Sequence, residues 1–303
     1  MNHVVAVPLD PELAQLVGKK GSENSITFYN STVDGHVIVA LAPTSMEDKF
    51  YAAAETLLLA QQVLLSTRDV DSLFGEMVVA CSLMDKEVLL TDDSDVSGIV
   101  GKAGIGKLTV VGRGDVLERI KSFSAGSGEP DVDARIDIDK AFDVKGIGTV
   151  ALGLVTRGSV KVHDELFHGS GRKAIVRSIQ SQDRDIAEAG TGTRVGLALK
   201  GIGTDSIRKG DLLTAREVKP VAAVDCNIRL SGVAKEDLQT GKVYGFISNF
   251  SYTNANVIRT DGNSVSLRLE KAIQVEKGDS FMLMRTKLPR LFASGHVVQT
   301  GHE

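Results

Sequence analysis

From residue 132 onward, short apolar strands recur along the chain, and turns that contain glycine separate them. Short alternating strands with glycine turns between them are typical of all-β barrels. We expect strands at residues 134–138, 148–155, 174–180, 193–199, 223–230, 242–246, 264–269 and 280–285. Pro220 lies between the fourth and fifth of these strands and marks a boundary. The pattern therefore predicts two β-barrels, at residues 132–219 and 220–303.

The first 121 residues follow a different pattern, in which strands and helices alternate. The expected strands are residues 3–7, 26–30, 36–42, 62–65, 76–81 and 108–111. Helices are expected at residues 11–17, after a capping-box pattern at 44–47, and from 116 to 120. This order predicts a mainly parallel sheet covered by helices. Residues 122–131 are rich in glycine and serine, so we expect a linker there.

Composition argues against a membrane protein. Hydrophobic residues make up 42% of the chain and charged residues 24%, which is close to the average for soluble globular proteins. No segment approaches the ~18 uninterrupted apolar residues of a membrane span, and the first residues lack the basic start of a secretory signal. We therefore expect no membrane partner and a cytoplasmic location. Cys81 and Cys226 lie in apolar runs expected to be strands, and we expect both to be buried free thiols.

Charge is divided unevenly along the chain. Residues 1–125 carry 10 Lys and Arg against 17 Asp and Glu, whereas residues 126–303 carry 25 against 22. The excess of negative charge in the front half disfavours binding of a triphosphate, which is itself negatively charged. The back half is only mildly basic, and a nucleic-acid-binding domain usually carries a larger excess of basic residues. We expect no DNA partner.

Most of the candidate chemical motifs lack the neighbouring residues or secondary structure that their chemistry requires. Residues 101–107 nearly spell a phosphate-binding Walker A loop, but Leu108 replaces the Ser or Thr that would hold Mg²⁺. A strand also follows this loop where a helix is required, so a flexible glycine loop is the better interpretation. The acidic residues at 92–95 lack the spacing of a calcium loop, the histidines are scattered, and nucleophile motifs such as G-x-S-x-G are absent. The sequence predicts no catalytic residue and no metal site.

The first expected barrel carries a series of motifs in a characteristic order. Residues 135–150 read RIDIDKAFDVKGIGTV, followed by GSVKVHDEL at 158–166, VRSIQ at 176–180, AGTGTRVGLALKG at 189–201 and IRKGDLL at 207–213. This series resembles the second domain of elongation factor Tu and of SelB, the selenocysteine-specific elongation factor. The segment at 275–281, Arg290 and the Ser-Gly-His at 294–296 resemble the third domain of the same family.

The front domain matches the GTP-binding domain of that family only in the order of its elements. The position of the family's phosphate loop, with its lysine and its Mg²⁺-binding hydroxyl, holds Pro8, Leu9, Asp10 and Gln15. Residues 41–45 replace Asp-x-Pro-Gly-His without its Asp or His, and no Ser-Ala element is recognisable near 110–113. Residues 82–85 replace the guanine-reading Asn-Lys-x-Asp and keep only Asp85, which could equally be an exposed acid at the end of a strand.

These losses predict a degenerate P-loop GTPase-like α/β domain at residues 1–121, which would make the chain a pseudo-GTPase with no cofactor. Two alternatives stay open on the sequence alone. One is a divergent, active GTPase that binds GTP and Mg²⁺ through residues 101–107 or another loop. The other is a protein-interaction scaffold with no role in RNA binding.

The resemblance also implies a binding surface. In the family, the acceptor end of aminoacyl-tRNA lies between the GTP-binding domain and the second domain, and Asp139 and Phe142 match positions that line this cleft. Core packing is the alternative role for Phe142. The candidate phosphate contacts are Arg172, Arg177, Arg285 and Arg290. The implied partners are tRNA, the ribosome or a translation-related protein.

Overall fold

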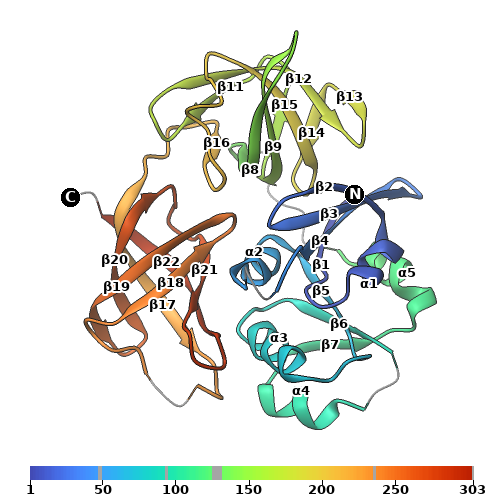
Figure 1. The fold of residues 1–303 in the computed structure, drawn as a ribbon, viewed down its shortest axis with the longest axis vertical. Helices are drawn as coiled ribbons and strands as arrows, with labels where there is room; N and C mark the ends of the chain where they lie inside the picture. The colour runs from blue at the N-terminus through green and yellow to red at the C-terminus, as the bar shows by residue number, and fades with distance from the viewer. Residues whose placement is uncertain (47–49, 93–94, 125–131, 235–236, 302–303) are drawn as a thin grey trace.

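The computed structural model describes residues 1–46, 50–92, 95–124, 132–234 and 237–301 (Figure 1). An α/β domain, residues 2–122, precedes a first barrel, residues 135–214, and a second barrel, residues 221–301. The expected fold class, an α/β domain followed by two β-barrels, is therefore confirmed. Among the described residues, no helix is long and apolar enough to span a bilayer.

The α/β domain is built on a seven-stranded sheet with the order β2-β3-β4-β1-β5-β6-β7. Its strands are β1 (Asn2–Ala6), β2 (Lys19–Glu23), β3 (Ile26–Val33), β4 (His36–Pro43), β5 (Gln62–Ser66), β6 (Glu87–Thr91) and β7 (Lys107–Val110). The neighbouring strands β4, β1, β5, β6 and β7 are parallel, whereas β2, β3 and β4 pair in antiparallel fashion. Every residue of β5 and β6 is buried, as expected for central strands with helices on both faces.

Helices cover both faces of this sheet. They are α1 (Pro11–Val17), α2 (Tyr51–Leu59), α3 (Ser72–Ser82), α4 (Ser97–Ala103) and α5 (Val116–Ser122), with a 3-10 turn at Arg113–Asp115. Leu13 of α1 and Ile120 of α5 share one buried cluster with Val5 of β1. Leu57 of α2 and Met77 of α3 belong to the cluster on the opposite face.

The prediction of a strand at residues 76–81 is wrong, because these residues lie in α3. Asp71 caps this helix, and its Oδ1 accepts a hydrogen bond of 2.9 Å from the Phe74 amide. The buried residues Phe74, Met77, Val78 and Cys81 follow the i, i+3, i+4, i+7 spacing of a helix. Cys81 is therefore a buried free thiol on a helix, whereas Cys226 lies on a strand as expected. Strands β2 and β6 and helix α4 were not anticipated.

The capping box expected at residues 44–47 does not start α2. The helix begins at Tyr51 after Phe50, which makes no side-chain capping bond. Thr44 instead pairs its hydroxyl with that of Thr27 at 3.0 Å, and Glu47 lies outside the described residues. The helix itself is buried nearly all round, because the sheet lies on one side of it and the second barrel on the other.

The first barrel contains β8 (Arg135–Val144), β9 (Gly148–Arg157), β10 (Ser159–Lys161), β11 (Glu165–His168), β12 (Lys173–Ser181), β13 (Arg184–Ile186), β14 (Glu188–Gly190), β15 (Arg194–Lys200) and β16 (Leu212–Thr214). Its main sheet has the order β11-β16-β8-β9-β15-β12-β13, and a further pairing of β11 with β12 joins the two sides. Alternate residues such as Ile136, Ala151 and Leu197 point into a shared core, which is the period-2 pattern that the sequence predicts.

The second barrel is closed, with the order β17-β20-β19-β18-β21-β22. Its strands are β17 (Val221–Leu230), β18 (Val243–Ser248), β19 (Ser251–Asp261), β20 (Ser264–Ile273), β21 (Ser280–Met284) and β22 (Leu291–Gly301). The stacked rings of Phe246 and Phe281, with centroids 4.7 Å apart, lie in its core.

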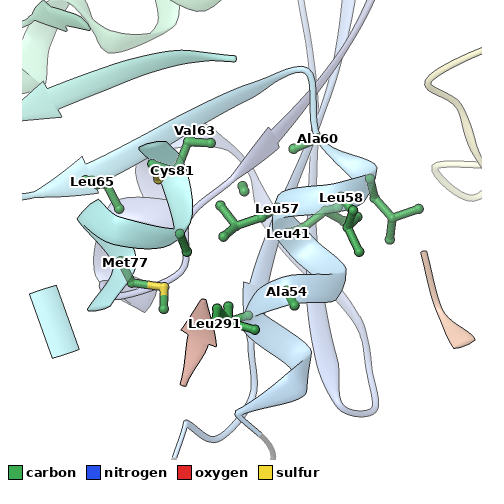
Figure 2. Packing of buried hydrophobic residues seen from close by; sticks show 14 of the residues in the cluster. Leu41, Ala54, Leu57, Leu58, Ala60, Val63, Leu65, Met77, Cys81 and Leu291 are labelled. Atoms are coloured by element: carbon green, nitrogen blue, oxygen red, sulfur yellow. The ribbon is translucent and has the colours of Figure 1, made fainter. Parts of the chain in front are cut away.

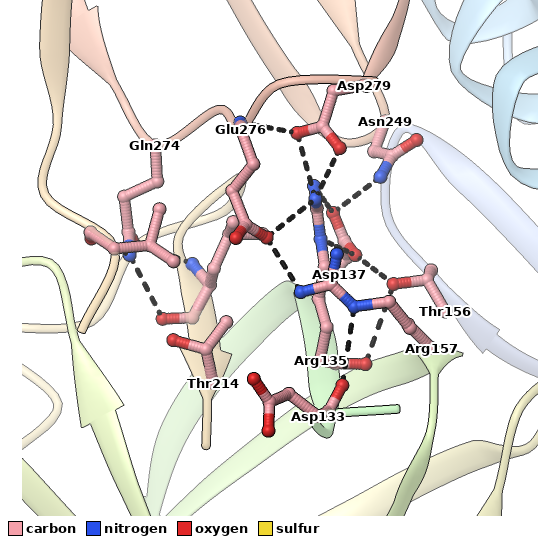
Figure 3. Close-up of polar contacts among 12 residues, drawn as sticks. Asp133, Arg135, Asp137, Thr156, Arg157, Thr214, Asn249, Gln274, Glu276 and Asp279 are labelled. Atoms are coloured by element: carbon pink, nitrogen blue, oxygen red, sulfur yellow. Dashed lines mark hydrogen bonds and ion pairs between the residues drawn. The ribbon is translucent and has the colours of Figure 1, made fainter. Parts of the chain in front are cut away.

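The two barrels are joined through a buried arginine (Figure 3). Arg135 of β8 donates to both carboxylate oxygens of Asp279 at 2.6 and 2.8 Å and pairs with its neighbour Asp137 at 3.1 Å. Glu276 of the second barrel accepts from Arg157 at 2.8 Å. Gln274 donates to the Val218 carbonyl at 2.8 Å. These contacts fix the barrels to each other.

The α/β domain packs directly on the second barrel. Its hydrophobic cluster includes Leu291 and Phe250 of that barrel, and Figure 2 shows Leu291 beside Ala54 of α2. Arg290 pairs with Glu76 of α3 at 2.7 Å, and its guanidinium lies 3.5 Å from the centre of the Phe50 ring.

Replacing Glu76 with Ala should lower the free energy of unfolding by about 2–3 kcal/mol, because the partly buried Arg290 loses its partner. Urea denaturation of the purified protein measures this change. The control is Lys173→Ala, which breaks the exposed pair with Glu165 and should cost less than about 1 kcal/mol. Equal effects of the two substitutions would contradict this role of Glu76.

Candidate functional site

In a parallel sheet of this kind, ligands bind beyond the carboxyl ends of the strands. At that edge, residues 7–10 connect β1 to α1, and Asp10 occupies the N-cap of the helix. Its Oδ1 accepts hydrogen bonds from the backbone amides of Glu12 at 3.0 Å and Leu13 at 3.1 Å. A carboxylate of the protein therefore takes up the helix amides that a bound phosphate would otherwise use.

Arg113, which follows β7, completes this arrangement. Its Nη2 lies 3.2 Å from Oδ2 of Asp10, and its Nε donates to Asp92 at 2.6 Å. Ser66 also donates to Asp92, at 2.7 Å. Arg113 and then Ser66 lower the pKa of Asp92, against the opposing effect of burial. We call Asp10, Asp92 and Arg113 the strand-end cluster, and it links the ends of β1, β6 and β7.

The residues around this cluster do not fit GTP. Pro8 and Pro11 lack backbone N–H groups, so the turn cannot form the row of amide donors that surrounds a phosphate. Leu9 packs against the hydrophobic cluster of the domain, and Gln15 is exposed on α1. The turn from residue 7 to residue 10 contains no lysine. In addition, α1 passes into β2 through Gly18 alone, which leaves no long loop between them to close over a ligand.

Asp85 and the glycine loop lie at the opposite edge of the sheet. Asp85 is exposed, but it precedes β6 and pairs with Lys107 at 3.3 Å. Matching residues 82–85 to a guanine-reading motif depended on the strand expected at 76–81, and α3 removes that basis. Residues 101–103 end α4, and Gly104 caps it in the left-handed conformation at φ 75°. A helix C-terminus presents carbonyl groups, which repel phosphate.

The cleft between the α/β domain and the first barrel is closed by an arginine that the sequence did not single out. Arg194 of β15 is buried and donates to Asp139 at 2.8 Å and to Ser22 of β2 at 3.0 Å. Its guanidinium lies 3.7 Å from the centre of the Phe28 ring. Asp139 is therefore a buried partner of Arg194 and not a surface acid. No local pattern reveals this contact, because the two residues are 55 positions apart.

Phe142 is not a core residue. Its side chain is 36% exposed on the outside of the first barrel, where Ile147 and Ile175 are 45% and 38% exposed. Arg177 donates to the Ile147 carbonyl at 3.0 Å, and the Lys140 ammonium lies 6.0 Å from the Phe142 ring centre. The outside of this barrel therefore carries exposed apolar residues and basic groups, and we call Phe142, Ile147, Ile175 and Arg177 together the barrel patch.

The other predicted arginines make contacts of their own. Arg172 is exposed and donates to Ser206 at 2.8 Å. Arg285 donates to the carbonyls of Leu288 and Pro289 within its own loop. Arg290 is engaged with Glu76, which assigns it to the domain boundary. Their contact with RNA stays a prediction.

A cavity of about 310 Å³ also lies where the three domains meet. Gln61, Arg157 and Asn249 line it, each from a different domain. Arg135 and Asp279, which also line it, are paired with each other (Figure 3). The cavity therefore adjoins the ion pairs that join the barrels.

The protein-family model for elongation factor Tu domain 2 matches residues 148–214. An uncharacterised protein of Methanocaldococcus jannaschii is 28% identical over 277 residues, which cover 88% of this chain and 90% of that protein. The selenocysteine-specific elongation factor of the same organism is 27% identical over 195 residues, 55% of this chain and 41% of that factor. Residues 148–214 therefore match elongation factor Tu domain 2, and the chain is similar in sequence to a selenocysteine-specific elongation factor.

Solved structures agree with this relationship at the level of the fold. SelB from Methanococcus maripaludis in complex with the GTP analogue GPPNHP has a TM-score of 0.82 at 18% identity, covering 99% of this chain and 80% of that chain. The chain spans less than half the length of the selenocysteine-specific factors that its sequence matches. The strand-end cluster therefore lies in a chain whose fold is similar to that of SelB.

Replacing Asp10 with Ala should lower the free energy of unfolding by about 1–2 kcal/mol, because the first turn of α1 loses its capping acceptor. Asp10→Asn keeps an oxygen at the cap and should lose much less. Thermal denaturation of both variants tests the role of Asp10. A stability of Asp10→Ala equal to that of the unchanged protein would contradict it.

Proposed function

We propose that this protein is a pseudo-GTPase of the elongation factor Tu and SelB family, which binds a translation partner through its barrels without GTP. The observation that carries this proposal is the carboxylate of Asp10 on the α1 amides, paired with Arg113. A phosphate brought to this helix would have to displace one negative charge that already has its donors. Displacement would also leave Arg113 with one partner fewer.

Charge and backbone support the same conclusion. The turn from β1 to α1 supplies no lysine to offset a triphosphate, and its two prolines remove amide donors. Asp10 and Asp92 add negative charge at the carboxyl edge of the sheet, where ligands of such folds bind. Each of these features weakens nucleotide binding independently, so restoring one of them alone would not restore a site.

The barrel patch is the surface that best suits a partner. Exposed aromatic rings beside basic groups bind single-stranded nucleic acid by stacking on the bases and pairing with phosphates. Phe142 supplies such a ring, and Arg177 and Lys140 supply the charges. Several relatives bear the name elongation factor, which makes an RNA of translation, such as tRNA or ribosomal RNA, the partner that we propose.

Calorimetric titration with GTP and Mg²⁺ should give no measurable heat of binding at micromolar to low millimolar nucleotide, because Asp10 already accepts the α1 amides that a phosphate would need. A selenocysteine-specific elongation factor serves as the positive control. Micromolar affinity would overturn the pseudo-GTPase proposal. If turnover were also detected, Lys107→Ala would decide whether residues 101–107 carry it.

Labelled deacylated tRNA should bind with an affinity that falls as salt rises, since phosphate contacts release counterions. Phe142→Ala should weaken binding about tenfold through lost stacking, and Arg177→Ala should reduce the salt slope by about 1. Electrophoretic mobility shifts at several salt concentrations measure both effects. The control is Arg259→Ala, an exposed arginine of the second barrel. No binding at low salt would favour a protein-interaction scaffold instead.

A further inference from the structure

Strand β7 forms one edge of the seven-stranded sheet. Among the described strands it pairs only with β6, so its other side is unpaired. Val111, directly after β7, donates its amide to the Leu90 carbonyl of β6 at 2.8 Å. Because alternate residues of a strand direct their backbone groups to opposite sides, the N–H and C=O groups of Leu108 and Val110 face away from β6. This edge can therefore accept a further strand.

The side chains along this edge are apolar and exposed. Leu108 and Val110 are two residues apart and lie on one face of the sheet, and Val110 is 73% exposed. Helix α4 leaves both uncovered, because a cavity of about 350 Å³ separates them from Val96 and Val100 at the start of the helix and within it. Apolar groups that gather at the surface in this way mark an interaction site.

Helix α4, which precedes β7, carries opposite charges at its two ends. Asp95 lies just before the helix, and Lys102 lies in its last turn. Both residues are exposed, and neither forms an ion pair with another of the described residues. Since α4 connects the parallel strands β6 and β7, it runs antiparallel to them, and its charged ends lie towards opposite ends of β7.

We propose that two copies of this protein associate through β7, by antiparallel pairing about a two-fold axis at Thr109. Leu108 of each copy then lies opposite Val110 of the other, and the two residues exchange both of their backbone hydrogen bonds. A shift of two residues in either direction would place Val110 opposite Gly106 or Leu108 opposite Gly112. The register about Thr109 is therefore the one that gives both apolar residues an apolar partner.

Charge complementarity favours a second copy as the occupant of this edge. The two-fold axis sets α4 of one copy antiparallel to α4 of the other. Each Lys102 is thereby brought towards Asp95 of the second copy, so the interface gains two pairings of opposite charge. One surface that is complementary to itself in charge and in apolar contacts is the requirement for a symmetric dimer.

The position of β7 in the molecule permits this association. Figure 1 shows β7 and α4 at the end of the α/β domain away from the first barrel, so two copies joined at β7 keep their first barrels at the far ends of the pair. The inference goes beyond the proposed function, because it requires neither nucleotide nor RNA.

Sedimentation velocity of the full chain over a micromolar concentration range should show a monomer that converts to a dimer as the concentration rises. Val110→Lys places a charge in the paired edge, so this variant should stay monomeric at every concentration. The matched control is Val243→Lys, which changes a valine of β18 that is 59% exposed, and it should dimerise like the unchanged protein.

Cysteine variants test the register even if Val110→Lys folds poorly. Thr109 lies on the two-fold axis, so Thr109→Cys places two thiols opposite each other at a Cα separation of about 4.5 Å, which a disulfide can span. Val110→Cys is more exposed, but it lies opposite Leu108 and should form linked dimers more slowly. Gel electrophoresis without reductant after mild oxidation measures both rates. The native Cys81 and Cys226 are buried and should not contribute.

Three results would overturn the dimer. A protein that stays monomeric over the whole range would leave the edge to a peptide or to a different protein. A dimer that persists in Val110→Lys would have to use another surface. Linkage of Val110→Cys that is as fast as that of Thr109→Cys would contradict antiparallel pairing about Thr109. None of these results bears on GTP or RNA binding, which calorimetry and the mobility shifts address separately.

Discussion

Charged pairs buried between the domains determine how the three parts of this protein fit together. Glu76 meets Arg290, Glu55 meets Lys209, and Arg135 meets Asp279, each pair across a different boundary. A buried charge has lost its hydration and depends on its partner. One domain therefore cannot slide along another without separating at least one pair, and the apolar contacts around Phe250 and Leu291 gain a defined register from these charges.

The strand-end cluster applies the same principle inside the α/β domain. The amides at the start of α1 need an acceptor, and Asp10 supplies it from within the chain. Arg113 then connects this carboxylate to Asp92, so the ends of three strands are held together without a bound ligand. The carboxyl edge of this sheet is therefore held together by side chains of the protein itself.

Local patterns predicted some of this correctly and missed the rest for physical reasons. The barrel strands follow a period of two with glycine turns, and these signals depend only on neighbouring residues. Helix α3 was misread because its apolar run from 76 to 81 was taken without Phe74, which reveals the helical spacing. Phe142 is exposed, so core packing is not its role, and its binding role stays a prediction, whereas Asp139, matched to a position that lines the cleft, is buried against Arg194.

The sequence by itself determined the order of the three domains, the relationship of the first barrel to elongation factor Tu, and which residues stand between the first strand and the first helix. Each of these features depends on residues that are close together in the sequence. Only the tertiary structure decided that Asp10 meets Arg113, that Arg194 closes the cleft, and that Lys209 of the first barrel reaches Ser25 and Glu55 of the α/β domain. Such contacts connect residues that lie up to 184 positions apart, and their strength comes from burial, which exists only once the chain has folded.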